Sequence, residues 1–100
     1  MTIYTFITSA STASGATSKS TLRCPGGLLK HVVIRSNTST TVFRAALVNE
    51  NSMTLAHWGF STGEINDYSI EVPVDGVYIF QVTNASPDDT FSIYGAVREK

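Results

Sequence analysis

The sequence predicts an all-β protein, an antiparallel β-sandwich for which the jelly roll is one candidate topology. Turn signals recur about every 8–12 residues, which is the spacing typical of sandwiches and barrels. Between the turns, apolar and polar residues alternate as they do in half-buried strands. No segment carries a sustained helical period. The chain has 100 residues, 42% of them hydrophobic, which fits one domain with its own core.

The clearest hairpin covers residues 26–49. Residues 28–35 are apolar and β-branched, residues 36–40 are a cluster of Ser, Thr and Asn, and residues 41–48 are again strand-like. On the second strand Phe43, Ala45 and Leu47 share one face. The other face, with Val42, Arg44, Ala46 and Val48, is also fairly apolar. A strand that is apolar on both faces is expected to be central in its sheet, or to be covered on its second side by a partner.

The second half of the chain reads as shorter strands separated by turns. Residues 53–60 fit either a strand or one helical turn, and we favour the strand. The remaining prediction is a loop at 61–67, a strand at 68–74, a tight turn at Asp75-Gly76, a strand at 77–83, a turn at 84–89 and a strand at 90–97. In the last strand Phe91, Ile93, Gly95 and Val97 alternate with Ser92, Tyr94 and Ala96.

The N-terminal segment allows two interpretations. Residues 8–21 are mostly Ser, Thr, Ala and Gly, too polar to fold alone, so residues 1–21 are predicted as an extended arm before a β-sandwich domain at 22–100. In that case Ile3, Tyr4 and Phe6 form an apolar tip that anchors the arm on a partner. The alternative is that the first residues add a strand to the chain's own sheet.

Charge is scarce and unevenly distributed. Charged residues make up 15% of the chain, against a usual quarter, which fits either a subunit with buried contacts or a Ser/Thr-rich surface. The first 49 residues hold five basic residues and no acid, whereas residues 50–97 hold seven acids and no base. Either the molecule has a basic and an acidic face, or the strands interleave and mix the charges.

No motif for catalysis or metal binding is present. Cys24 has no second cysteine, His31 and His57 lack ligand-like neighbours, and no serine stands in a Gly-x-Ser-x-Gly turn. We therefore expect no enzyme, no metal and no cofactor. The sequence pI of about 6.0 argues against nucleic acid as a partner. The chain shows neither a membrane span nor a signal peptide, so it is expected to act without secretion.

Two aromatic residues are candidates for ligand stacking. Trp58, the only tryptophan, could stack on a sugar ring together with Tyr68, or with Tyr94 in its place, if the rings are exposed. A core position for Trp58 is the alternative, because burying it would supply much of a small core.

The Ser/Thr-rich start and the compact block from 22 to 97 resemble the small β-structured proteins of tailed-bacteriophage particles, that is, head-decoration (cement) and minor tail proteins. The phrases LLKHVVIRSNTSTTVFRAALVNENSMTLAHWGF and GVYIFQVTNASPDDTFSIYGAV carry this resemblance. It implies a virion structural protein, assembled in the host cytoplasm. Such a protein would form a homo-oligomer and stabilise the particle by binding the major capsid or tail protein. Arg35 and Arg44 are then predicted lattice contacts. The alternative function is a carbohydrate- or receptor-binding β-sandwich.

Overall fold

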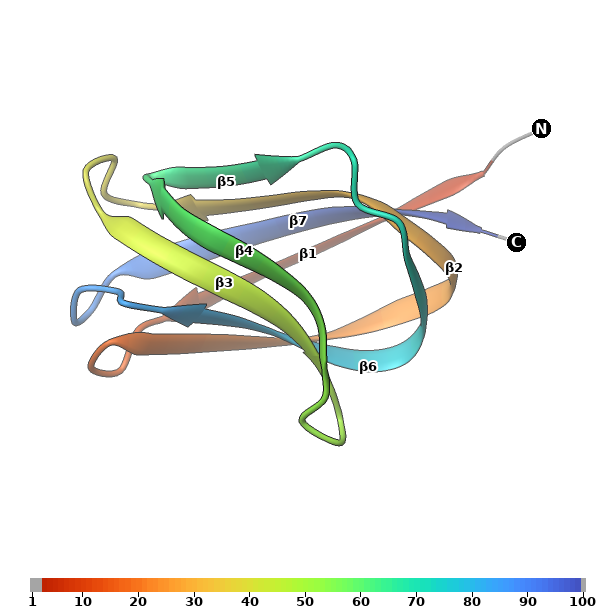
Figure 1. Cartoon of the computed structure of the whole chain (residues 1–100), viewed down its shortest axis with the longest axis horizontal. Coiled ribbons are helices and arrows are strands. Elements are labelled where there is room, and N and C mark those ends of the chain that lie inside the picture. Colours follow the sequence, from red (N-terminus) through yellow and green to blue (C-terminus); the bar gives the residue numbers. More distant parts are fainter. Residues whose placement is uncertain (1–2, 100) are drawn as a thin grey trace.

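The computed structural model describes residues 3–99 and confirms the all-β, sandwich-like prediction (Figure 1). All neighbouring strands pair antiparallel, in the order β1-β7-β2-β6-β3-β4, with β5 beside β2. The seven strands, one fewer than in a jelly roll, are β1 (Tyr4–Thr12), β2 (Thr17–Ser36), β3 (Val42–Asn49), β4 (Thr54–Thr62), β5 (Glu64–Asp67), β6 (Val72–Thr83) and β7 (Thr90–Glu99). No helix that could cross a membrane occurs within residues 3–99.

The single sheet folds over on itself to give two layers. We call layer 1 the strands β1 and β7, the second half of β2 from Gly27, and β5. Layer 2 contains the first half of β2 up to Cys24, most of β6, and then β3 and β4. β2 belongs to both layers and is visible in Figure 1 as the long strand that curves round one end.

The corner between the layers is made by β2 and β6 bending together. Cys24 pairs with Gly76 and Gly27 pairs with Val74, with a register shift between the two pairs. Gly76 has φ +116°, a conformation that side chains rarely adopt. The tight turn predicted at Asp75-Gly76 is therefore wrong: these residues bend a continuous β6 instead of reversing the chain.

The first residues form a strand of the chain's own sheet, which was the alternative to an arm. β1 pairs with β7 from Tyr4 opposite Arg98 to Thr12 opposite Thr90. β2 begins at Thr17 and runs across position 21, the predicted boundary between the arm and the domain. The polar composition is tolerated because the backbone of this segment is paired, and because small side chains such as Ser11 and Ser18 hydrogen-bond to each other between the layers.

The core lies between the layers and matches the alternation seen in the sequence. Phe43, Phe80 and Phe91 are fully buried, and the rings of Phe43 and Phe91 meet edge to face at 5.0 Å. The alternation predicted for β7 is confirmed by the burial of Phe91, Ile93 and Val97. In β3, where both faces are fairly apolar in sequence, the face with Ala45 and Leu47 is the buried one. The strand predicted at residues 53–60 is confirmed as β4.

Candidate functional site: an aromatic face on layer 1

Four aromatic rings from different segments line up across the outer face of layer 1. Phe6 of β1 stacks on Tyr94 of β7 with ring centroids 5.7 Å apart. Tyr94 meets His31 of β2 edge to face at 5.7 Å, and His31 stacks on Tyr68 at 4.3 Å. The row runs across the strands, so it spans about 14 Å at the usual strand spacing of ~4.8 Å.

A bulge in β2 brings His31 to this face. The pairing with β7 shifts between Leu29, which is opposite Val97, and His31, which is opposite Ala96. Leu29 is fully buried and Val32 is the next buried residue, so Lys30 and His31 both lie outside the core. A bulge of this kind re-aims side chains locally.

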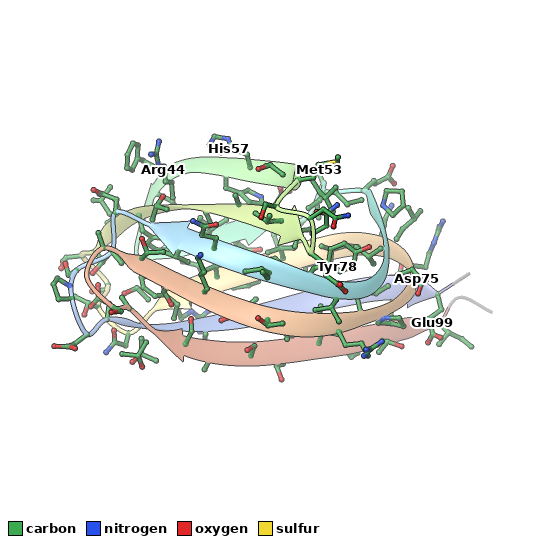
Figure 2. All side chains as sticks on the ribbon, turned by 90° about the horizontal axis from the view of Figure 1, so that it is seen from below. Arg44, Met53, His57, Asp75, Tyr78 and Glu99 are labelled. Carbon is green, nitrogen blue, oxygen red and sulfur yellow. The ribbon has the colours of Figure 1, made fainter. Side chains whose placement is uncertain are left out.

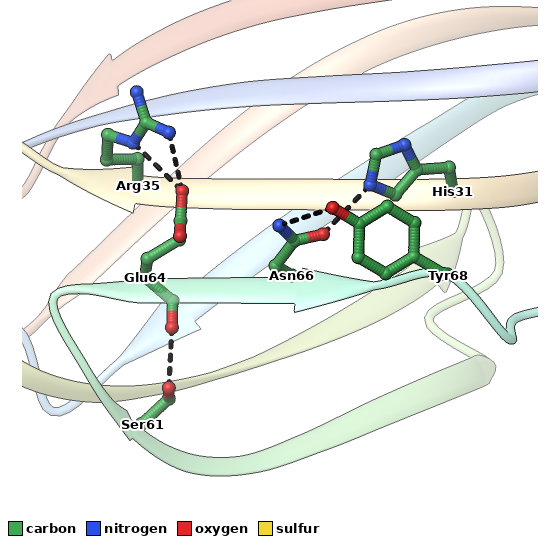
Figure 3. Close-up of polar contacts among 6 residues, drawn as sticks. All are labelled: His31, Arg35, Ser61, Glu64, Asn66 and Tyr68. Carbon is green, nitrogen blue, oxygen red and sulfur yellow. Dashed lines mark hydrogen bonds and ion pairs between the residues drawn. The ribbon is translucent and has the colours of Figure 1, made fainter.

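Tyr68 follows directly after β5 and is held by polar contacts (Figure 3). His31 Nε2 and Asn66 Oδ1 are 2.9 Å apart, and Asn66 Nδ2 donates to the Tyr68 hydroxyl at 3.2 Å. One face of the Tyr68 ring stacks on His31, yet the side chain is 73% exposed. A large part of the ring is therefore accessible to a ligand.

An open groove of about 700 Å³ lies beside the row. Its residues on the outer face are Thr8, Ala10, Val33, Arg35, Ser92 and Tyr94. Arg35 Nη2 and Glu64 Oε1 are 2.6 Å apart, which fixes a charged pair at one side of the groove. The groove therefore combines one ring of the row, Tyr94, with small residues and with the paired Arg35 side chain, a mixture of aromatic and polar groups that is common in ligand sites.

The two predicted stacking residues do not form a common platform. Trp58 points between the layers, where its ring stacks on buried Phe80 at 6.4 Å and its Nε1 donates to Asp67 Oδ2 at 2.8 Å. This hydrogen bond, together with one from the Ser69 backbone, lowers the pKa of the Asp67 carboxyl. Of these two residues, only Tyr68 has an exposed ring.

The predicted partner-binding residues fall on two surfaces. Ile3, Tyr4 and Phe6 are exposed at the start of the chain, and Arg35 lies on the outer face of layer 1. Arg44 lies on the outer face of layer 2, where its Nε donates to Thr83 Oγ1 at 3.1 Å and its guanidinium covers the Phe60 ring (Figure 2). Arg35 and Arg44 therefore cannot contact the same part of a partner.

The fold brings some basic residues of the first half next to acidic residues of the second half. Lys30 pairs with Glu71, which lowers the pKa of that carboxyl, and Arg35 pairs with Glu64. The other three basic residues of the first half, Lys19, Arg23 and Arg44, are exposed and lie on strands of layer 2. Within residues 3–99 no group of three His, Cys, Asp or Glu side chains could hold a metal ion.

No family model and no curated protein matches this chain. Among solved structures, the crystal structure of FlhE is similar, with a TM-score of 0.56, 10% identity, and coverage of 96% of this chain and 98% of that chain. PliG, a periplasmic inhibitor of g-type lysozyme from Aeromonas hydrophila, gives a TM-score of 0.47 at 13% identity, covering 96% and 86% of the two chains.

A carbohydrate-binding module, CBM36, in complex with calcium and xylotriose gives 0.45 at 12% identity, covering 90% and 78%. At 10% identity the similarity to FlhE shows a shared fold alone. The class that the fold defines is therefore a small antiparallel β-sandwich protein.

Proposed function

We propose that this chain is a non-catalytic binding module that recognises a glycan on the outer face of layer 1. The observation that carries the proposal is the row of four aromatic rings beside an open groove. The C–H-rich face of a sugar ring packs against an aromatic face, and its hydroxyl groups need planar polar partners. Phe6 and Tyr68 supply exposed rings at the two ends of the row, while Asn66, Arg35 and Glu64 supply the polar groups.

The shape of the site favours a chain of sugars over a single one. The row covers four segments in one direction, and the groove is open instead of enclosing a small ligand. Exposed aromatic rings on a rigid sheet lose little conformational entropy on binding, because a ring has only two side-chain torsions. Binding by a preformed face requires no catalytic group, in agreement with the sequence.

The test is titration with short soluble oligosaccharides of neutral hexoses, pentoses and N-acetylhexosamines, followed by amide NMR shifts and calorimetry. Tyr68→Ala and Phe6→Ala should each weaken binding about tenfold, since ~1.4 kcal/mol per ring corresponds to that factor. Phe60→Ala is the matched control, because Phe60 is 62% exposed, like Phe6, but its ring lies under Arg44 of layer 2. Equal losses for Phe6→Ala and Phe60→Ala, or no binding to any glycan, would contradict the proposal.

A second candidate is the virion role, in which the chain docks on an assembled particle. It is supported by the exposure of the three proposed anchor residues, Ile3, Tyr4 and Phe6, at 54%, 47% and 62%. Their partner would be the major capsid or tail protein. Co-sedimentation with particles tests this role. A double Tyr4→Ala, Phe6→Ala variant should no longer sediment with the particles. If as much of the variant as of the wild type sediments with them, these residues are not the anchors.

A further inference from the structure

β1 is an edge strand without the features that normally prevent edge pairing. Its nine residues, YTFITSAST, contain no charge and no proline, and it pairs with β7 without a register shift. Within residues 3–99 no other strand forms a ladder with its outer edge; the chain bridges back to the start of β2 only past the end of β1, at Ser14 and Thr17. Figure 2 shows β1 at the margin of the molecule. The edge strands β4 and β5 differ: β4 has two register shifts against β3, and β5 has only four residues. Natural proteins protect long edges with charges, prolines or bulges, so β1 is the exception here.

The backbone groups that point outward from β1 can be identified. Glu99 N donates to Ile3 O at 2.9 Å, and Ala13 N donates to Asp89 O at 2.7 Å. In an antiparallel pair, residues that exchange hydrogen bonds alternate with residues whose N–H and C=O point the other way. The odd-numbered residues of β1 are therefore bonded to β7. The even-numbered residues, from Tyr4 to Thr12, direct their N–H and C=O groups away from the sheet.

We propose that two copies of this chain form a two-fold dimer through antiparallel pairing of β1 with β1 of the partner, with Thr8 opposite the partner's Thr8. This register pairs even-numbered residues with even-numbered residues over the whole strand, so every outward N–H and C=O group finds a partner. The same surface on both subunits is the commonest arrangement of a dimer. The joined layers 1 would form one continuous sheet, as in other cases of strand addition.

The side chains of β1 suit this register. Large residues stand in its first half and small ones in its second half. On the outer face, antiparallel pairing places Tyr4 opposite the partner's Thr12, and Phe6 opposite the partner's Ala10. On the inner face, Ile7 meets the partner's Ser9. Large side chains thus face small ones, whereas in-register parallel pairing would place each bulky residue against its copy.

The dimer would also complete the aromatic face. Ala10 lines the groove of one copy, and the partner's Phe6 would stand directly opposite it. Each groove would then gain a second aromatic ring, and the two grooves would share one face of the joined sheet. This last point rests on the proposed glycan site, but the dimer itself does not.

The test is the mass in solution, measured by sedimentation and light scattering over a range of concentrations. The wild type should approach twice the 10.8 kDa of one chain. Thr8→Lys should raise the dimer dissociation constant at least tenfold, because two like charges would lie opposite each other. Thr8→Glu should do the same, and mixing the two variants should restore a heterodimer. Thr54→Lys, an exposed threonine on the β4 edge, is the matched control and should leave the dimer intact.

Each outcome bears on the proposal. A wild type that stays monomeric at every concentration would overturn it, and so would a Thr8→Lys variant that dimerises like Thr54→Lys. Failure of the mixture to associate, with both variants folded by Trp58 fluorescence, would exclude the Thr8-centred register. A dimer that binds no glycan would overturn the proposed function alone, whereas a glycan-binding monomer would overturn only the dimer.

Discussion

Replacing Gly27 by alanine should strongly destabilise the protein, because this glycine lies where β2 turns from one layer to the other. A Cβ atom at position 27 would lie 2.2 Å from the Arg98 carbonyl oxygen and 2.9 Å from its carbon. Carbon atoms normally approach a carbonyl oxygen no closer than ~3.3 Å, so the backbones would have to separate by about 1 Å. Both neighbours are backbone atoms, so no side-chain rotation can relieve the clash.

The cost can be worked out from this geometry. Overpacking costs about 1–3 kcal/mol, and parting the strands would weaken the backbone hydrogen bonds around Gly27 and Glu99 by about 1 kcal/mol each. A loss of about 3 kcal/mol follows. For a domain of this size it corresponds to a drop in Tm of more than about 10 °C.

Gly26 offers a matched control one residue away. A Cβ atom there would lie 3.5 Å from Asp75 Oδ2, which is ordinary contact with a side chain. Gly26→Ala should therefore be neutral or should stabilise by a few tenths of a kcal/mol, since it restricts the unfolded chain. Urea unfolding followed by Trp58 fluorescence at one fixed protein concentration measures both variants. If both variants unfold at the same urea concentration, the close approach at Gly27 does not control the fold.

Two further predictions concern titratable groups. The pKa of Asp67 is lowered in the folded protein mainly by the Trp58 hydrogen bond. The ionised carboxylate therefore contributes its full stabilisation above the unfolded pKa of about 3.9. This stabilisation is lost as the pH falls through the lower pKa of the folded protein. Asp67→Asn should flatten the fall in stability between about pH 4 and pH 2 in urea titrations, and an unchanged pH slope would refute this. Burial raises the pKa of the Cys24 thiol to about 11, so at pH 8 a thiol reagent should label unfolded chains quickly and native protein only at the rate of unfolding; fast native labelling would contradict the buried position.

The alternation of residue types was enough to predict the fold class and much of the core. Phe91, Ile93 and Val97 are buried on one face of β7, in line with the alternation, because a strand with one face in the core needs strict two-residue periodicity. For β3 the alternation grouped Phe43 with Leu47, but it did not show which of two apolar faces enters the core. The corner could not be predicted in the same way. Gly, Pro and Asp signal a change of backbone direction, but the local sequence does not distinguish a bend in a long paired strand from a turn between two strands.

Two other differences between the predicted and the observed structure arise from strand pairing between distant parts of the chain. The loop predicted at residues 61–67 contains β5, a strand of four residues that exists only because β2 provides an edge for it. The Ser/Thr-rich segment 8–21 has little apolar content, but its backbone forms strand pairs with β7 at residues 8–12 and with β6 at residues 17–21. In both places long-range hydrogen bonding decides the structure, and composition does not reveal it.

The aromatic face depends on the register of strand pairing, which the alternation of apolar and polar residues does not reveal. Strict alternation along residues 28–35 would place Leu29 and His31 on the same side of β2. The shift against β7 between these two residues separates them, so that Leu29 enters the core and His31 reaches Tyr94. Because His31 is the link between the Phe6–Tyr94 stack and Tyr68, this one bulge joins two pairs of rings into a single row. The bulge therefore explains how four rings from different segments come to lie in one row, an arrangement that the alternation of residue types does not reveal.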